Sequence, residues 1–168
     1  ASLMNQKKLF FGVIGDLAFF YDMNVVANRH VGSNVRILLV NNGVGTEFKL
    51  SQHFSSKLGE ASDQYISAGG HFGNKSPELV RHYAEDLGYE YFSADSKDTF
   101  LEVYEHFLSP ETLSKPIIFE VFTDCDAEAE ALNQVCVIKK DAKSSMRMAA
   151  KKAMGDKGYD VVKKIVKR

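Results

Sequence analysis

One carboxylate and two carboxamides follow two apolar runs near the start of the chain. Asp16 comes after the run Leu9–Ile14 and Gly15, and Asn41–Asn42 follow the run Ile37–Val40. Carboxylate, amide and backbone carbonyl oxygens are hard ligands that Mg²⁺ prefers, and Mg²⁺ usually completes its coordination with phosphate oxygens and water. The surrounding glycines let a backbone come close to a bulky anion. The pattern therefore predicts a site for a magnesium-bridged diphosphate.

Two strands and a helix must bring these polar residues together. The run Leu9–Ile14 is apolar on both alternations, as expected of a strand buried on both faces of a parallel sheet, and Ile37–Val40 repeats the pattern. Between them, apolar residues recur at three- and four-residue steps, which predicts a helix from Ala18 to Val31. Both strands of a right-handed βαβ unit end at the same edge of the sheet, so we expect Asp16 and Asn42 to converge.

A plainer interpretation of each half is also open. Gly15–Asp16 is typical of a strand-to-helix turn with a capping aspartate, and Asn41–Asn42 is typical of a loop. Either half alone favours this interpretation. The two halves together, on consecutive strands and 42 − 16 = 26 positions apart, favour the ligand site.

The two segments resemble a known family of enzymes. Gly-Asp followed at this spacing by Asn-Asn is similar to the motif of thiamine diphosphate-dependent enzymes. Residues 15–24 (GDLAFFYDMN) and 41–48 (NNGVGTEF) most resemble the branch that contains the menaquinone-pathway synthase and the acetolactate synthase-like group, in which a leucine likewise follows the aspartate. The resemblance implies an α/β fold: a doubly wound, mainly parallel sheet with helices on both faces, here followed by a basic helical C-terminal tail.

The resemblance also implies the cofactors and the roles of individual residues. Thiamine diphosphate and Mg²⁺ would be bound together. The side chains of Asp16 and Asn42 and the backbone carbonyl of Val44, where many relatives have glycine, would bind Mg²⁺. No catalytic residue is assigned within the chain. The residues expected beside the cofactor are Gly15, Leu17, Ala18, Gly45, Thr46 and Glu47.

The composition is that of an ordinary soluble domain, with 168 residues, 45% hydrophobic, 26% charged and a net charge of −1. No apolar run is long enough to span a bilayer and the N-terminus lacks a signal-peptide pattern, so we expect a cytoplasmic protein without a membrane span. Cys125 and Cys136 have neither CxxC spacing nor a neighbouring histidine, which predicts buried free thiols. The five histidines lack ligand spacing, so no transition-metal site is expected.

Three segments are expected along the chain. Residues 1–3, which precede Met4, are typical of a cloning remnant. Residues 4–138 correspond to part of a diphosphate-binding domain. Residues 139–168 carry eleven Lys or Arg against three Asp, with apolar residues at helical steps, and predict a basic amphipathic helical tail. For this tail, a solvated face around a docking stripe is favoured over a polyanion-binding surface.

Further elements are expected beyond Asn42. The segment 46–73 has few regular signals, and is either a cover over the active site, as in the resembled family, or a disordered surface loop. Asp124 and Asp126 are interpreted first as loop or helix-capping acids, and only second as ligands of another metal site. The regular elements predicted are helices over 76–88 and 96–109 and strands over 89–94 and 117–124.

The function implied by the resemblance belongs to a larger protein. The chain would be a C-terminal fragment of a thiamine diphosphate- and Mg²⁺-dependent enzyme that decarboxylates a 2-oxo acid and can transfer the acyl carbanion to an acceptor. The N-terminal pyrimidine-binding and middle domains would lie elsewhere in that protein, so the chain alone is expected to be inactive. Because the catalytic glutamate in the family comes from a neighbouring subunit, a homodimer or homotetramer is expected.

A non-catalytic interpretation is the alternative. An α/β domain of this kind can hold Mg²⁺ or a nucleotide at its strand edge, or use a basic tail to bind a polyanion. Nucleic acid is not the expected partner, because only one aromatic residue, Tyr159, is interspersed among the basic residues of the tail.

Overall fold

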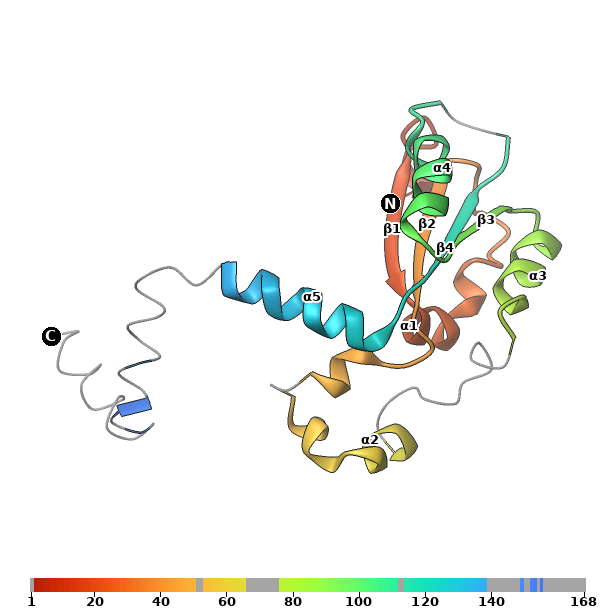
Figure 1. Cartoon of the computed structure of the whole chain (residues 1–168). Coiled ribbons are helices and arrows are strands. Elements are labelled where there is room, and N and C mark those ends of the chain that lie inside the picture. Colours follow the sequence, from red (N-terminus) through yellow and green to blue (C-terminus); the bar gives the residue numbers. More distant parts are fainter. Residues whose placement is uncertain are drawn as a thin grey trace, which may run out of the picture. The chain divides into compact units, whose positions relative to one another are not determined.

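The computed structural model describes residues 2–50, 53–65, 76–111 and 114–138, together with 149, 152, 153 and 155. The chain divides into two compact units, residues 1–129 and 130–168. A four-stranded sheet with the order β1-β2-β4-β3 forms the centre of the first unit (Figure 1). Its strands are β1 (Phe10–Gly15), β2 (Val35–Asn41), β3 (Glu90–Ala94) and β4 (Ile117–Phe122).

All three strand pairings of the sheet are parallel. The carboxyl ends of the strands therefore lie at one edge, with Gly15 paired to Val40 and Asn41 to Phe122. The helices are α1 (Asp16–Tyr21), α2 (Glu60–Tyr65), α3 (Leu79–Asp86), α4 (Lys97–Leu108) and α5 (Cys125–Ile138), with 3₁₀ turns η1 (Ser2–Met4), η2 (Met23–Val25), η3 (Thr46–Lys49) and η4 (Phe54–Leu58).

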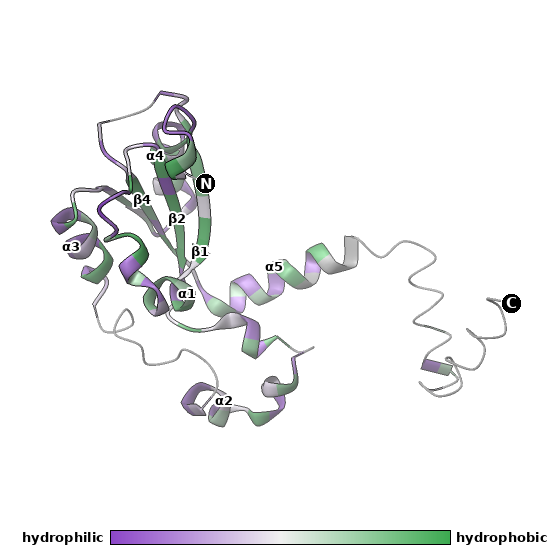
Figure 2. Ribbon diagram, turned by 180° about the vertical axis from the view of Figure 1, so that it is seen from behind, coloured by the Kyte–Doolittle hydropathy of each residue, from purple (hydrophilic) through white to green (hydrophobic). Residues whose placement is uncertain are grey.

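Helices cover both faces of the sheet. Phe19 of α1 and Val80 of α3 belong to one core cluster with Leu39 of β2. On the opposite face, Phe107 of α4 packs on Phe119 of β4, with ring centroids 5.6 Å apart. Figure 2 shows the hydrophobic colouring of β1 and β2 over most of their length. The predicted doubly wound α/β fold is confirmed, because a parallel sheet with two apolar faces is covered from both sides.

The prediction that the first strand is buried on both faces is wrong. β1 lies at an edge of the sheet and, among the described strands, pairs only with β2. Phe11 is 49% exposed and Val13 is 74% exposed. The apolar run identified the strand, but its place in the sheet depends on pairing partners that hydrophobic periodicity does not specify.

The helix predicted over 18–31 is also wrong in its extent. α1 begins at Asp16 and ends at Tyr21, because Asp22 has φ −130° and ψ 41°, outside the helical region. The 3₁₀ turn η2 follows. Farther along, the Asn28 side-chain oxygen accepts a hydrogen bond from the His30 N–H at 2.9 Å. Such local side-chain bonds compete with helical hydrogen bonding.

The elements predicted beyond Asn42 are found with shifted bounds. Ser96 and Thr99 form a capping box at the start of α4, where the sequence predicted the beginning of a helix. Gly88 has φ 82° and follows the end of α3, which suits a helix stop. At its other end α3 starts at Leu79, not at Ser76, and its N-cap residue Glu78 makes no side-chain capping bond.

Helix α5 was not predicted as an element. Its start is capped by Asp124, whose Oδ1 accepts hydrogen bonds from the Asp126 N–H at 3.1 Å and the Ala127 N–H at 2.9 Å. The capping interpretation of Asp124 is therefore confirmed. Within the described residues, no group of three or more His, Cys, Asp or Glu is arranged to hold a metal ion, so the second metal site finds no support.

Several expectations concern segments only partly described. The described part of the segment 46–73 contains η3, η4 and α2, more regular structure than predicted. The predicted basic tail over 139–168 lies outside the described residues, apart from positions 149, 152, 153 and 155. Cys125 is a half-buried free thiol, whereas the side chain of Cys136 lies outside the described residues. None of the described helices has the length and apolar content needed to cross a membrane.

Candidate functional site

A cavity of about 380 Å³ opens at the carboxyl ends of β1 and β2. Ligand sites of parallel α/β sheets lie at this edge, and the volume is in the range of ligand pockets. Four lining residues were not predicted from the sequence: Tyr21, Val40, Phe48 and Glu128. All nine residues singled out in the sequence line this cavity: Gly15, Asp16, Leu17, Ala18, Asn42, Val44, Gly45, Thr46 and Glu47.

Asp16 stands where β1 passes into α1. Gly15 is the last residue of the strand and the N-cap of the helix, with φ −80° and ψ 159°. The change from extended to helical backbone places Asp16 in the first turn, where it is only 2% exposed while lining the cavity. A carboxylate buried to this extent is stabilised by a cation or by hydrogen bonds.

The two adjacent asparagines have different surroundings. Asn41 is buried, and its Nδ2 donates to Oε1 of Glu120 at 2.7 Å. Its Oδ1 accepts a hydrogen bond from the Gly43 N–H at 3.1 Å, and Gly43 has φ 75°, a backbone conformation that favours glycine. Asn41 therefore fixes the turn after β2, and only Asn42 of the pair lines the cavity.

The side-chain amide of Asn42 is hydrogen-bonded at both ends. Its Nδ2 donates to Oγ1 of Thr46 and, at 2.8 Å, to Oε2 of Glu128. Its Oδ1 accepts a hydrogen bond from the Val44 N–H at 3.0 Å. An amide oxygen has two acceptor positions, so Oδ1 retains one for a further ligand.

At Gly45 it is the close packing of neighbouring side chains, and not the backbone conformation, that favours glycine. A Cβ atom at this position would lie 2.9 Å from Cδ2 of Phe48 and 3.1 Å from Cδ2 of Leu17. A side chain there would force the aromatic ring to move. The loop is tight here, because the Thr46 N–H donates to the Val44 carbonyl at 3.1 Å.

The described charged side chains that line the cavity are all acidic. Three carboxylates, those of Asp16, Glu47 and Glu128, are among the described residues that line it, and none of these lining residues is Lys, Arg or His. Such a site attracts a cation. An anion can enter on favourable terms only if a cation offsets its charge.

A further glutamate, Glu120, lies in the inner strand β4, beside Asn41 at the end of β2. Glu120 is 0% exposed and accepts hydrogen bonds from Asn41 and, at 2.6 Å, from the Tyr91 hydroxyl. Burial raises the pKa of its carboxyl group above the ordinary value, although both hydrogen bonds act in the opposite direction. Glu120 was not predicted as a site residue, although a charged residue inside the apolar run Ile117–Phe122 is a visible signal.

Glu128 was missed for a different reason. It lies in the first turn of α5, a helix that the sequence analysis did not predict, and its backbone N–H donates to the Asp124 carbonyl at 2.9 Å. The Thr123 hydroxyl donates to its Oε1, so both of its carboxylate oxygens have partners. The sequence signal that could have identified Glu128 was an acidic residue four positions after the capping Asp124.

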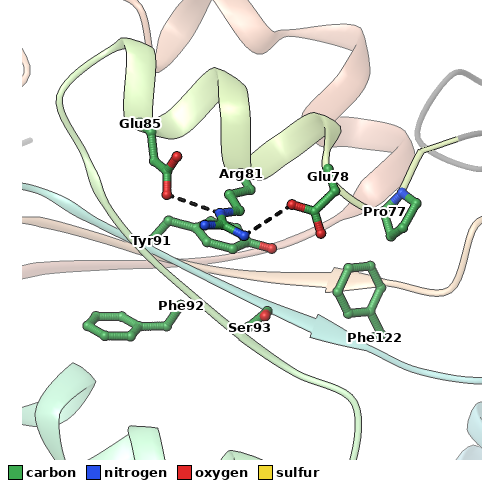
Figure 3. A pocket seen from close by; sticks show the side chains of 8 residues that line it. All are labelled: Pro77, Glu78, Arg81, Glu85, Tyr91, Phe92, Ser93 and Phe122. Atoms are coloured by element: carbon green, nitrogen blue, oxygen red, sulfur yellow. Dashed lines mark hydrogen bonds and ion pairs between the residues drawn. The ribbon is translucent and has the colours of Figure 1, made fainter.

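A second cavity, of about 330 Å³, lies beside α3 and β3 (Figure 3). Arg81 lines it, and Figure 3 shows the guanidinium between Glu78 and Glu85, at 3.2 and 3.1 Å. Both carboxylates offset the charge of the guanidinium, which weakens it as an anion-binding group. None of the residues singled out in the sequence lines this cavity.

Comparisons with known proteins point to one group of enzymes. No protein-family model matches the chain. The chain is 39% identical over 127 residues to the 2-succinyl-5-enolpyruvyl-6-hydroxy-3-cyclohexene-1-carboxylate synthase of Bacteroides fragilis, a match that covers 76% of the chain and 21% of that protein. The chain is also similar to proteins of the same name from two further bacteria. It is 35% identical over 133 residues to that of Phocaeicola vulgatus, which covers 77% of the chain and 22% of that protein. It is 36% identical over 127 residues to that of Bacteroides thetaiotaomicron, which covers 76% of the chain and 21% of that protein. The chain spans about a fifth of the length of the curated relatives it matches.

Proposed function

The chain is homologous, over 76% of its length, to part of the 2-succinyl-5-enolpyruvyl-6-hydroxy-3-cyclohexene-1-carboxylate synthases, and from this premise we propose that it is the C-terminal, diphosphate-binding part of a thiamine diphosphate-dependent enzyme. The observation that carries the proposal is the cavity at the ends of β1 and β2. Nine residues chosen from two separate sequence segments all line it.

In this proposal the cation is bound by hard oxygen atoms from both strand ends. Asp16 supplies a carboxylate, Asn42 its Oδ1 and Val44 its backbone carbonyl. This donor set suits Mg²⁺, which keeps its remaining positions for phosphate oxygens and water. The three carboxylates of the cavity also make a cation the necessary companion of any diphosphate.

The diphosphate is bound beside the cation by backbone groups and small side chains. The first N–H groups of a helix have no partner within that helix, and those of Leu17 and Ala18 begin α1 at the cavity. The open space beside Gly15, where an added Cβ would meet nothing within 4 Å, allows close approach of the anion. Gly45, Thr46 and Glu47 complete this side of the site.

The relatives' name indicates the chemistry of the whole enzyme. Their product carries a succinyl group on a ring carbon, so an acyl carbon becomes joined to that ring. Thiamine diphosphate supplies the electron sink that lets a 2-oxo acid lose CO₂ and act as an acyl carbanion donor. The residues of this chain would bind and orient the diphosphate end. The catalytic glutamate would come from another domain, across a dimer or tetramer interface, so the chain alone is expected to be inactive.

Isothermal titration calorimetry tests the proposal directly. Thiamine diphosphate with Mg²⁺ should bind the chain, and Asp16→Ala and Asn42→Ala should each abolish the binding heat. Glu102→Ala, at an exposed position of α4, is the matched control and should bind like the wild type. Binding that survives both site substitutions would overturn the proposal. A preference for magnesium nucleotides over magnesium thiamine diphosphate would favour the non-catalytic alternative.

A further inference from the structure

Glu128 is a cavity-lining carboxylate that is hydrogen-bonded to a proposed cation ligand. Its Oε2 accepts from Nδ2 of Asn42 at 2.8 Å, and its Oε1 accepts from the Thr123 hydroxyl. Thr123 is in turn tied to the end of β2, because its N–H donates to the Asn41 carbonyl at 3.0 Å. The carboxylate is therefore held from one side and directed at Asn42 on the other.

The two ends of an asparagine side chain have nearly the same shape. Rotation by half a turn about χ2 exchanges the amide oxygen and nitrogen, at little steric cost. Only the oxygen can bind a cation, so an asparagine ligand needs a neighbour that distinguishes the two ends. A carboxylate oxygen has no proton to donate, so it selects the orientation in which the NH₂ group faces it.

We propose that Glu128 is a positioning residue of the cation site, which holds the Asn42 amide with its nitrogen toward Glu128, so that the remaining acceptor position of Oδ1 can bind the cation. The inference rests on the proposed function and adds to it a group that does not itself touch the cofactor. Thr46 accepts the second amide hydrogen of Asn42, but a hydroxyl both donates and accepts, so it selects neither orientation. Glu128 fixes the nitrogen end of the amide, and the Val44 N–H, which donates to Oδ1 at 3.0 Å, favours the same orientation at the other end.

The same arrangement explains why an asparagine is used in place of an aspartate. Aspartate is a stronger ligand for a hard cation, but it cannot donate a hydrogen bond to Glu128. Two carboxylates with oxygens at the 2.8 Å separation seen here would repel each other. Asparagine is the residue of this size that can bind a cation through oxygen while donating to a neighbouring carboxylate.

The test measures cation affinity and not activity. Mn²⁺ is titrated into the full chain with saturating thiamine diphosphate, and bound metal is followed by electron paramagnetic resonance. Loss of a group that orients a metal ligand typically weakens metal binding by about 10- to 100-fold. We expect a loss of this size for Glu128→Ala. Glu130→Ala removes an exposed glutamate from the same helix, hydrogen-bonded to Gln134, and should leave the affinity unchanged.

A double variant in which the acid and the amide change places separates loss of the Asn42 orientation from general damage to the fold. Asn42→Asp alone should weaken Mn²⁺ binding, because the two carboxylates then face each other. The double variant Asn42→Asp/Glu128→Gln should recover much of the loss, because the glutamine NH₂ can donate to the new carboxylate while its oxygen accepts from Thr123. Thermal unfolding monitors the integrity of every variant.

The outcomes distinguish the inference from the proposed function. Equal Mn²⁺ affinity in the wild type and Glu128→Ala would overturn the positioning role alone. A double variant that binds no better than Asn42→Asp would do the same. If the wild type binds no Mn²⁺ with thiamine diphosphate, the proposed function fails and the inference fails with it.

Discussion

The side-chain amide of Asn41 donates to the fully buried carboxyl group of Glu120 across two neighbouring strands, at 2.7 Å. The hydroxyl of Tyr91 on β3 donates to the other oxygen of the same carboxyl group. One buried acid thus connects β2, β3 and β4 directly behind the turn that carries Asn42. The positions of Asn41 and Asn42 are each set by a glutamate, one in the core and one in α5.

The buried acid makes stability depend on pH in a definite direction. Burial raises the pKa of Glu120 above its ordinary value of 4.5, so the folded chain holds a proton that the unfolded chain releases once the pH exceeds that value. The contribution to the free energy of unfolding is fully present below pH 4.5 and is lost as the pH rises toward the raised pKa. Urea unfolding between about pH 4 and 8 should show a smaller pH slope for Glu120→Gln than for the wild type. Glu102→Gln, at an exposed site, should keep the wild-type slope; equal slopes for all three proteins would contradict the prediction.

Binding of the diphosphate should require a divalent cation. The cavity has three carboxylates and no cationic side chain among its described lining residues, so the bare anion is repelled. Calorimetry with thiamine diphosphate in excess EDTA should show no binding heat, and added Mg²⁺ should restore it. Comparable affinity with and without the cation would mean that basic groups elsewhere in the chain bind the phosphates.

Two glycines of the site should respond differently to alanine. At Gly45 the new methyl group would overlap Phe48 at 2.9 Å, so we expect a loss of about 1–3 kcal/mol in the free energy of unfolding. At Gly15 the methyl group meets nothing within 4 Å and φ is −80°, so the free energy of unfolding should be unchanged. The affinity for the diphosphate should fall, because the methyl group occupies space that the anion needs. Urea denaturation and calorimetry on both variants check the contrast. Gly12→Ala, also without a neighbour within 4 Å and outside this cavity, is the control for both measurements.

Arg36 should be the most costly cation to remove from the described fold. Its fully buried guanidinium donates to the backbone carbonyls of Phe107, Ser109 and Glu111, at 2.5 to 2.6 Å, and so holds the end of α4 and the chain that follows. Arg36→Met leaves these carbonyls without their donor, and we expect a loss of about 3 kcal/mol or more. The urea midpoint measures it. Arg81→Met, which removes two exposed ion pairs, should cost less than about 1 kcal/mol; similar losses for both variants would refute the assignment.

The sequence was most informative where local chemistry and strand order agree. The motif at Asp16 and the motif at Asn42 each had a plainer explanation, but parallel strand pairing places both at one edge, and all nine residues line one cavity. The capping box at Ser96 and the stop at Gly88 were predictable because short-range hydrogen bonds and backbone conformation decide them. These features depend on neighbours in the chain or on a general rule of sheets.

The parts that could not be predicted depend on contacts between distant residues. The partners of Glu120 lie 29 and 79 positions away, and Glu128 meets Asn42 across 86 positions. No local pattern specifies such a contact. The early end of α1 has a local cause in Asp22, but competing turn hydrogen bonds and helical periodicity are both compatible with that stretch. The interpretation of the segment as a longer helix failed for that reason.

The position of β1 at the border of the sheet bears on the handling of the protein. Among the described strands, none pairs with the outer side of β1, and Val13 on this strand is largely exposed. Such an edge is a template for intermolecular strand addition. Aggregation of concentrated samples should begin there. A lysine at position 13 would oppose it through charge repulsion while leaving the packed interior unaltered.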